Sequence, residues 1–167
     1  HGANAYLVDQ FLRDGANKRD DGYGGSIANR TRFMAEVVSA AIDIFGANKV
    51  GIRLSPHVKA DGICDSDPQA LFGHAAGVLS DLGVAYIHLI EATLPGAAQA
   101  PPAGRKPIME VIREHYRGAL IVNNSYDRQR AIDVVGSGKA DGVAFAIPYI
   151  ANPDLAERLA LNAPLND

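Results

Sequence analysis

Four short apolar runs, separated by segments of helical period, are the feature that most restricts the fold of this chain. The runs begin near residues 49, 84, 119 and 142, so they are spaced by 35, 35 and 23 residues. Runs this short and rich in β-branched residues suit parallel strands that are buried on both faces. The spacing is that of a βαβ unit. The sequence therefore predicts an α/β fold in which parallel strands alternate with helices.

Helices are expected between these strands. Apolar residues recur at three- and four-residue steps from Phe33 to Phe45, which gives one apolar stripe on a helix that starts near Ser26. Asp67 and Pro68 have the residue types of an N-cap and of a first helical position. Further helices are expected over residues 108–115, 127–137 and 154–161.

Charge and apolar content exclude several classes of protein. The 16 Lys and Arg residues against 19 Asp and Glu give a net charge of −3, and no basic run occurs, so no nucleic-acid partner is expected. No stretch approaches the roughly 20 apolar residues of a membrane span. The single cysteine, Cys64, cannot form an internal disulfide, so a cytoplasmic location is expected.

The opening segment places an imidazole, a carboxamide and a phenol within six residues, at His1, Asn4 and Tyr6. On a loop that leaves a strand, His1 and Asn4 could both donate hydrogen bonds to one carbonyl oxygen, and Tyr6 could donate a proton. A solvated terminus without a chemical role is the alternative. The spacing alone leaves both interpretations open.

Two strand residues and a group of carboxylates also have the chemistry of a site. Arg53 lies within an apolar run, where a guanidinium is costly to bury unless it meets an anion or an electron-rich ring; an Arg that reaches solvent from the strand end is the alternative. His88 is interpreted as a satisfied core or strand-end histidine. Asp61, Asp65 and Asp67 match no calcium loop, so no metal site is expected.

With these residues in view, the chain resembles the C-terminal part of the Old Yellow Enzyme family of flavin-dependent ene-reductases. The matching stretches are HGANAYLVDQFLRDGANKRDDGYGGSIANRTRF (1–33), KVGIRLSP (49–56), DSDPQALF (65–72) and IANPDLAERLALNAPLN (150–166). Within the family the chain is similar to the oxophytodienoate and N-ethylmaleimide reductases. The resemblance implies an α/β fold that is the C-terminal portion of a TIM (β/α)8 barrel. Residues 1–167 then form a single partial barrel domain of approximately the last four βα units.

The resemblance also implies a reaction and assigns roles to residues. In the family, NAD(P)H reduces a bound FMN, which passes a hydride to the activated C=C of an α,β-unsaturated carbonyl or nitro compound. His1 and Asn4 match the residues that bind the substrate oxygen, and Tyr6 matches the catalytic proton donor. Arg53 matches the arginine that lies against the N1/C2-oxygen edge of the flavin.

The expected flavin-phosphate site departs from the family pattern. Asn124 and Ser125 align with a glycine-bearing turn, and Asn124 stands at the usual glycine. Ala146 and Ile147 align with a Gly-Arg pair, so the arginine that binds the phosphate is absent. Loss of such a charge-assisted contact costs about 1.5–3 kcal/mol. A catalytically silent half-barrel that acts as a structural or oligomerisation module is therefore the alternative function.

The length of the chain indicates what else the fold requires. A barrel of this type needs roughly 250 residues, and the chain has 167 and begins at His1 rather than Met. The earlier strands, which supply flavin-ring contacts and much of the substrate pocket in the family, are expected to lie outside it. Because a half-barrel has two open parallel edges, we expect self-association or pairing with a missing N-terminal half-barrel.

Overall fold

The computed structural model describes residues 1–57, 62–91 and 104–167. Its elements are α1 (Leu7–Leu12), α2 (Ile27–Phe45), the 3-10 helix η1 (Ala47–Lys49), β1 (Gly51–Leu54), α3 (Pro68–Leu82), β2 (Tyr86–Ile90), α4 (Ile108–His115), β3 (Ala119–Asn123), α5 (Arg128–Gly136), β4 (Gly142–Ala144), α6 (Ile147–Ala151) and α7 (Leu155–Leu161). The expected strands and the helices between them are confirmed to within a few residues. The short helices α1, η1 and α6 were not predicted.

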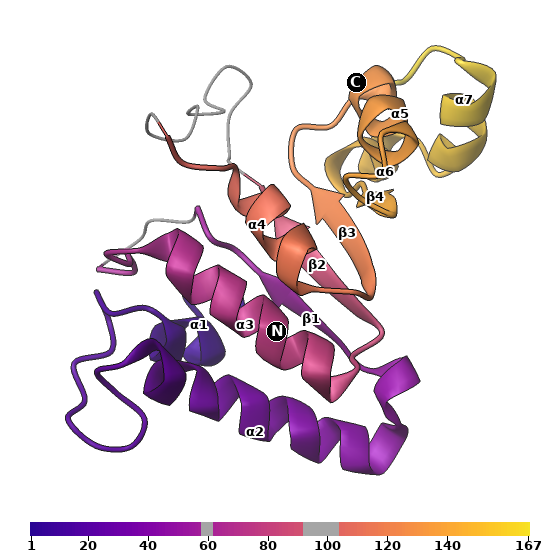
Figure 1. The fold of residues 1–167 in the computed structure, drawn as a ribbon. Helices are drawn as coiled ribbons and strands as arrows, with labels where there is room; N and C mark the ends of the chain where they lie inside the picture. Colours follow the sequence, from indigo (N-terminus) through magenta and orange to yellow (C-terminus); the bar gives the residue numbers. More distant parts are fainter. Residues whose placement is uncertain (58–61, 92–103) are drawn as a thin grey trace.

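The strands of the described residues form one parallel sheet in the order β1-β2-β3-β4 (Figure 1). Leu54 pairs with Leu89, which pairs with Val122, and Val122 pairs with Val143. Because side chains alternate between the two faces of a strand, this register places one row of apolar side chains on a common face of the sheet.

Helices α2, α3 and α4 cover that apolar face, with α3 between the other two (Figure 1). Leu54, Leu89 and Val122 of the sheet and Leu79 and Ile112 of the helices belong to one buried cluster. Each such side chain contributes roughly 1.5–3 kcal/mol by leaving water. The core of the molecule therefore lies between the sheet and these helices.

The opposite face of the sheet is polar in its centre, where it carries Arg53, His88 and Asn123, each half-buried. Near the start of the strands, the ring of Tyr86 lies against Gly51, so closely that a Cβ at residue 51 would come within 2.4 Å of the ring. We call this face, which α2, α3 and α4 leave uncovered, the inner face.

The free edge of β1 pairs with the first residues of the chain. Gly2 forms an isolated parallel bridge with Leu54, and the Gly2 N–H donates to the Arg53 carbonyl at 2.9 Å. Gly2 thus lies where the end of a further parallel strand would pair with β1. This bridge brings the His1–Tyr6 segment to the carboxyl end of the sheet.

Side-chain caps begin the helices where the sequence predicts them. Ser26 accepts from the Asn29 N–H at 3.2 Å at the start of α2, and Asp67 accepts from the Ala70 N–H at 3.3 Å at the start of α3. Pro68 occupies the first turn of α3. These caps satisfy backbone donors that have no partner within the helix.

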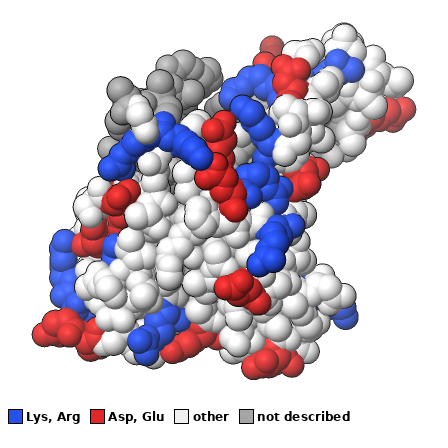
Figure 2. Space-filling view, viewed as in Figure 1, with Lys and Arg blue, Asp and Glu red and all other residues white. Residues whose placement is uncertain are grey.

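Positive and negative side chains are interspersed over the face that carries α2, α3 and α4, and neither sign dominates it (Figure 2). Among the described residues, no helix is long and apolar enough to cross a membrane.

The packing at Gly15 yields a test of the fold. A Cβ at this residue would lie 2.4 Å from the Cys64 sulfur and 2.5 Å from the Gly62 carbonyl oxygen. Gly15→Ala must therefore displace the backbone of the 62–64 segment, and we expect a loss of about 1–3 kcal/mol in the free energy of unfolding.

Gly77→Ala is the matched control, because it lies inside α3 with nothing within 4 Å of the added Cβ. The control should gain about 0.5–1 kcal/mol. Urea unfolding monitored by circular dichroism measures both, and equal effects would contradict the packing at Gly15.

Candidate functional site

Apart from Arg53, which lies within β1, the predicted site residues lie beyond the carboxyl ends of the strands. The Asn4 N–H donates to Ser55 Oγ at 2.7 Å, and Ser55 directly follows β1. Asn124 and Ser125 directly follow β3. Because parallel strands end at the same edge of a sheet, these groups share one edge, which is where (β/α)8 barrels carry their active sites.

The His1–Tyr6 segment forms a compact loop at the end of β1. The ring centroids of His1 and Tyr6 are 5.1 Å apart, and the ring planes meet at 55°. Asn4 and Ala5 both have left-handed backbone conformations, with φ values of 56° and 64°. Asn4 is exposed to solvent, and Tyr6 is 61% exposed. Both residues are therefore accessible to a ligand. The structure brings these three side chains together on one loop.

Arg53, His88 and Asn123 lie on the inner face, on three neighbouring strands. Arg53 pairs with His88, and His88 pairs with Ile121 on β3. Asn123 lies two residues beyond Ile121 and therefore on the same face of the sheet. Arg53 Nε, His88 Nε2 and Asn123 Oδ1 are buried and have no hydrogen-bond partner in the described part of the chain. Buried polar atoms are normally paired, so this cluster indicates a place where a further polar group belongs.

The environment of His88 differs from the sequence-based interpretation. We expected a satisfied histidine, but Nε2 lacks a partner among the described residues. Burial, and then the positive charge of Arg53, lower the pKa of His88 from its ordinary value of 6.5, while the neighbouring Asn123 side chain opposes this shift. Burial and the guanidinium thus both disfavour the protonated imidazole. The sequence offered no signal for this, since strand periodicity does not show which neighbours face a side chain.

The turn after β3 has the backbone shape that glycine favours, although glycine is absent. Asn124 has φ of 100° and Ser125 has φ of 57°, values that cost a residue with a Cβ roughly 1–2 kcal/mol. Asn124 Nδ2 donates to the Glu91 carbonyl at 3.1 Å. The Tyr126 hydroxyl donates to the Glu91 carboxylate, and burial together with this bond raises the pKa of Tyr126. Glu91, which directly follows β2, thus holds this turn through its carbonyl and its carboxylate.

Ala146 lies between β4 and α6, and Ile147 is the first residue of α6. Both are exposed, and Ile147 is exposed by 81%. Neither side chain offers a donor or a positive charge to a phosphate. The two segments expected at the phosphate thus provide left-handed backbone at Asn124 and Ser125 and no cation at residue 147.

The carboxylates singled out in the sequence have structural partners. Asp65 pairs with the buried Arg30, and Asp67 caps α3. Asp61 lies outside the described residues. Within the described ranges, no group of three or more metal-binding side chains is present.

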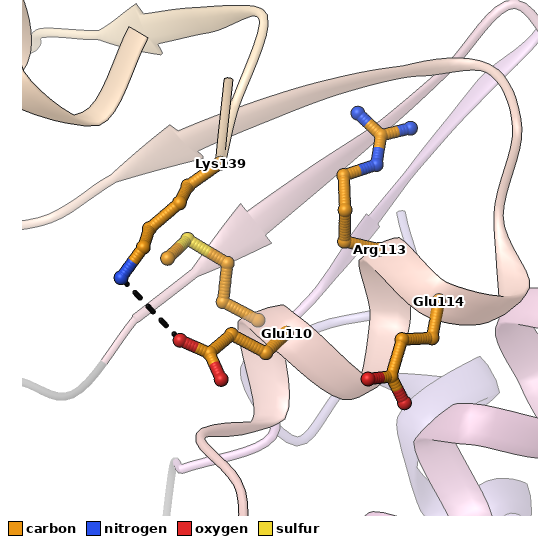
Figure 3. Close-up of a pocket in the computed structure, with 5 residues that line it drawn as sticks. Glu110, Arg113, Glu114 and Lys139 are labelled. Atoms are coloured by element: carbon orange, nitrogen blue, oxygen red, sulfur yellow. Dashed lines mark hydrogen bonds and ion pairs between the residues drawn. The ribbon is translucent and has the colours of Figure 1, made fainter. Parts of the chain in front are cut away.

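A hollow lies on the helix-covered side of the sheet (Figure 3). It is lined by Met109, Glu110, Arg113 and Glu114 of α4 and by Lys139, which precedes β4. Lys139 Nζ lies 3.4 Å from Glu110 Oε1. None of the residues that line this hollow belongs to the candidate site.

Comparison with known proteins decides the family. The family model described as "NADH:flavin oxidoreductase / NADH oxidase family" matches residues 1–166. The chain belongs to this family. Its relatives include "Putative 12-oxophytodienoate reductase 10" of Oryza sativa subsp. japonica, which is 43% identical over 99% of this chain and 53% of its own length. "12-oxophytodienoate reductase 1" of the same organism is 42% identical over 99% of this chain and 43% of its own length.

Solved structures of the same family agree with this fold. Morphinone reductase matches with a TM-score of 0.92 and 45% identity, over 100% of this chain and 44% of its own. The Old Yellow Enzyme homologue from Zymomonas mobilis matches with a TM-score of 0.91 and 36% identity, over 100% of this chain and 46% of its own. These matches confirm the resemblance to Old Yellow Enzymes and the interpretation as a portion of a TIM barrel. The chain spans about half the length of the curated relatives it matches.

The family implies a flavin, and the residues of the inner face fit one. Arg53 Nε is a buried donor without a partner in the described structure, and the flavin edge expected there carries acceptors. At the expected phosphate end, Asn124 and Ser125 have the left-handed conformations that a glycine-bearing turn would adopt readily. The missing cation at residue 147 weakens this end of the site. The fit is therefore good at the ring and incomplete at the phosphate.

The lowered pKa of His88 predicts a pH dependence of stability. The unfolded chain takes up a proton on this imidazole as the pH falls through 6.5, whereas the folded chain does so only at lower pH. The free energy of unfolding should therefore fall between pH 7.5 and 5.5, and His88→Gln should reduce that fall. His74→Gln, at an exposed position of α3, is the matched control for the removal of a histidine. Urea unfolding at several pH values checks this. An unchanged slope in His88→Gln would contradict the assignment.

Proposed function

We propose that this chain is the C-terminal portion of an NAD(P)H-dependent flavin oxidoreductase that reduces the activated C=C of α,β-unsaturated carbonyl or nitro compounds. One observation carries the proposal. The loop with His1, Asn4 and Tyr6 is hydrogen-bonded to the end of β1, the strand that also carries Arg53 with its unpartnered Nε. Substrate-binding donors and a flavin-facing guanidinium thus share one end of the sheet.

Each residue has a chemical task in this proposal. His1 and Asn4 donate hydrogen bonds to the substrate oxygen, which stabilises the negative charge that grows on it during hydride addition. Tyr6 donates its hydroxyl proton to the α-carbon. When bound, FMN supplies the hydride, which it obtains from NAD(P)H. A cytoplasmic location is part of the same proposal.

The residues that would hold the FMN divide into two groups. Arg53 would bind the ring edge, where its positive charge favours the anionic reduced form. Asn124, Ser125, Ala146 and Ile147 would line the phosphate with backbone groups. The family affiliation and the left-handed conformations of Asn124 and Ser125 support this assignment. The substitution at Ile147 favours the alternative, a half-barrel without catalytic activity.

Restoring the phosphate site tests the cofactor assignment. We expect Ala146→Gly combined with Ile147→Arg to raise FMN affinity about 10- to 100-fold, since a charge-assisted contact contributes roughly 1.5–3 kcal/mol. The gain requires a completed barrel, made by joining the chain to the N-terminal half of the rice 12-oxophytodienoate reductase. Quenching of flavin fluorescence measures the affinity.

Riboflavin, which lacks the phosphate, is the control ligand and should show no gain in the double variant. An equal gain in affinity for riboflavin would show that the new arginine does not bind the phosphate. Arg53→Met should weaken both ligands, because Arg53 is assigned to the ring. If the completed barrel binds neither flavin, the proposed activity is wrong and the silent half-barrel is supported.

The open sheet predicts association in solution. The inner face is uncovered by the described helices, and α6 exposes Ile147 by 81% and Ile150 by 84%. We expect the 167-residue chain to self-associate at micromolar concentration and to form a one-to-one complex when the N-terminal half of the rice relative is added. Sedimentation velocity measures both species. A compact monomer that does not bind the added N-terminal half would contradict this expectation.

A further inference from the structure

A buried carboxylate lies directly beneath the candidate catalytic loop. Asp9, in the first turn of α1, is 0% exposed. Its Oδ2 accepts from the Ala5 N–H at 3.0 Å and from the Ser55 hydroxyl at 3.4 Å, and its Oδ1 accepts from Arg13 Nε at 2.9 Å. A buried charge is tolerated when it is paired and hydrogen-bonded in this way. Asp9 therefore connects the loop, the helix and the end of β1.

The loop needs such a connection because its backbone is unfavourable. Asn4 and Ala5 are consecutive left-handed residues, and alanine adopts this conformation at a cost. Such conformations persist only where the surroundings determine them. The Asn4 N–H is held by Ser55 Oγ at 2.7 Å, the Ala5 N–H by Asp9, and the Ala5 carbonyl by Gln10 Nε2 at 2.7 Å. These bonds fix the direction in which the loop presents Asn4 and Tyr6.

Arg13 extends the connection to the backbone that follows Arg53. Its side chain is 1% exposed and donates to the carbonyls of Ser55 and Pro56, at 3.1 Å for Pro56. Its guanidinium lies 4.8 Å from the centre of the Phe72 ring in α3. The loop is thus tied to the same strand end that carries Arg53, which fixes the two parts of the site relative to each other.

A second buried ion pair offers a comparison. Arg30 and Asp65 are also nearly inaccessible and bind each other, but their remaining hydrogen bonds go to Leu12, Asp14, Gly25 and Asp67. They do not contact Asn4 or Ala5. Both ion pairs can stabilise the fold, but of the two only the Asp9–Arg13 pair has a hydrogen bond to the loop, through Asp9.

We propose that Asp9, supported by Ser55 and Arg13, is a positioning residue that holds the Asn4–Ala5 turn so that Asn4 and Tyr6 face the substrate. The part of this statement that concerns substrate rests on the proposed function. The part that concerns the turn does not.

The turn is tested in the 167-residue chain by NMR. Ser55→Ala removes an uncharged acceptor, and Asp9→Asn removes the charge but keeps the shape. We expect each to lower the hydrogen-exchange protection of the Asn4 and Ala5 amides at least tenfold more than that of the core strands, and to weaken the nuclear Overhauser contact between the His1 and Tyr6 rings. Asp65→Asn is the matched control: it should destabilise the whole chain and leave the relative protection of both amides unchanged.

Two results would overturn the positioning role. One is a Ser55→Ala chain whose Asn4 and Ala5 amides and ring contact are as in the wild type. The other is an Asp65→Asn chain that loses them to the same relative extent. Because Ser55→Ala introduces no unpaired charge, it decides the question even if Asp9→Asn does not fold.

Kinetics of the completed, FMN-loaded barrel separate this inference from the proposed function. With cyclohex-2-enone as substrate, we expect Ser55→Ala to lower kcat for enone reduction roughly tenfold to a hundredfold. The rate of flavin reduction by NAD(P)H should stay within about twofold of the wild type, because the loop acts on the alkene step. A wild type that does not reduce the enone contradicts the proposed function, while the NMR result still decides the turn. Normal enone turnover in Ser55→Ala would overturn the positioning role.

Discussion

Burial of one apolar face of the parallel sheet under α2, α3 and α4 is the interaction on which the rest of the molecule depends. Because this face is closed by Leu79 and Ile112 of the helices, all polar side chains of the strand centres must lie on the other face. Arg53, His88 and Asn123 are collected there by the two-residue repeat of the strands. The same sheet also sets the common edge at which the loops meet. Packing on one side of the sheet therefore determines the chemistry on the other.

Much of this architecture is predictable from local sequence, for physical reasons. The strands are marked by short β-branched runs, and the starts of α2 and α3 by Ser26 and by Asp67 with Pro68, which are signals that act within a few residues. The helix α6 was missed, because its five residues show too little periodicity. Similarly, α1 is too short to repeat an apolar stripe.

The supports of the candidate site could not be predicted in the same way. Asp9 and Arg13 are four residues apart, a spacing typical of exposed ion pairs on helices, and only the tertiary fold shows that both are buried. The unpartnered nitrogen of His88 likewise depends on which strands are neighbours. The candidate functional residues were assigned through the family resemblance, and Asn124 has a positive φ at the position where that resemblance places a glycine.

The order of the strands has a consequence for how the chain acquires its structure. In the described sheet, β2, β3 and β4 each pair with the strand that precedes them, so each of these pairings closes a loop of a few tens of residues. Closing such a loop costs less entropy than pairing strands that are farther apart in the sequence, because the cost grows with loop length. The described sheet can therefore form one strand after another along the chain.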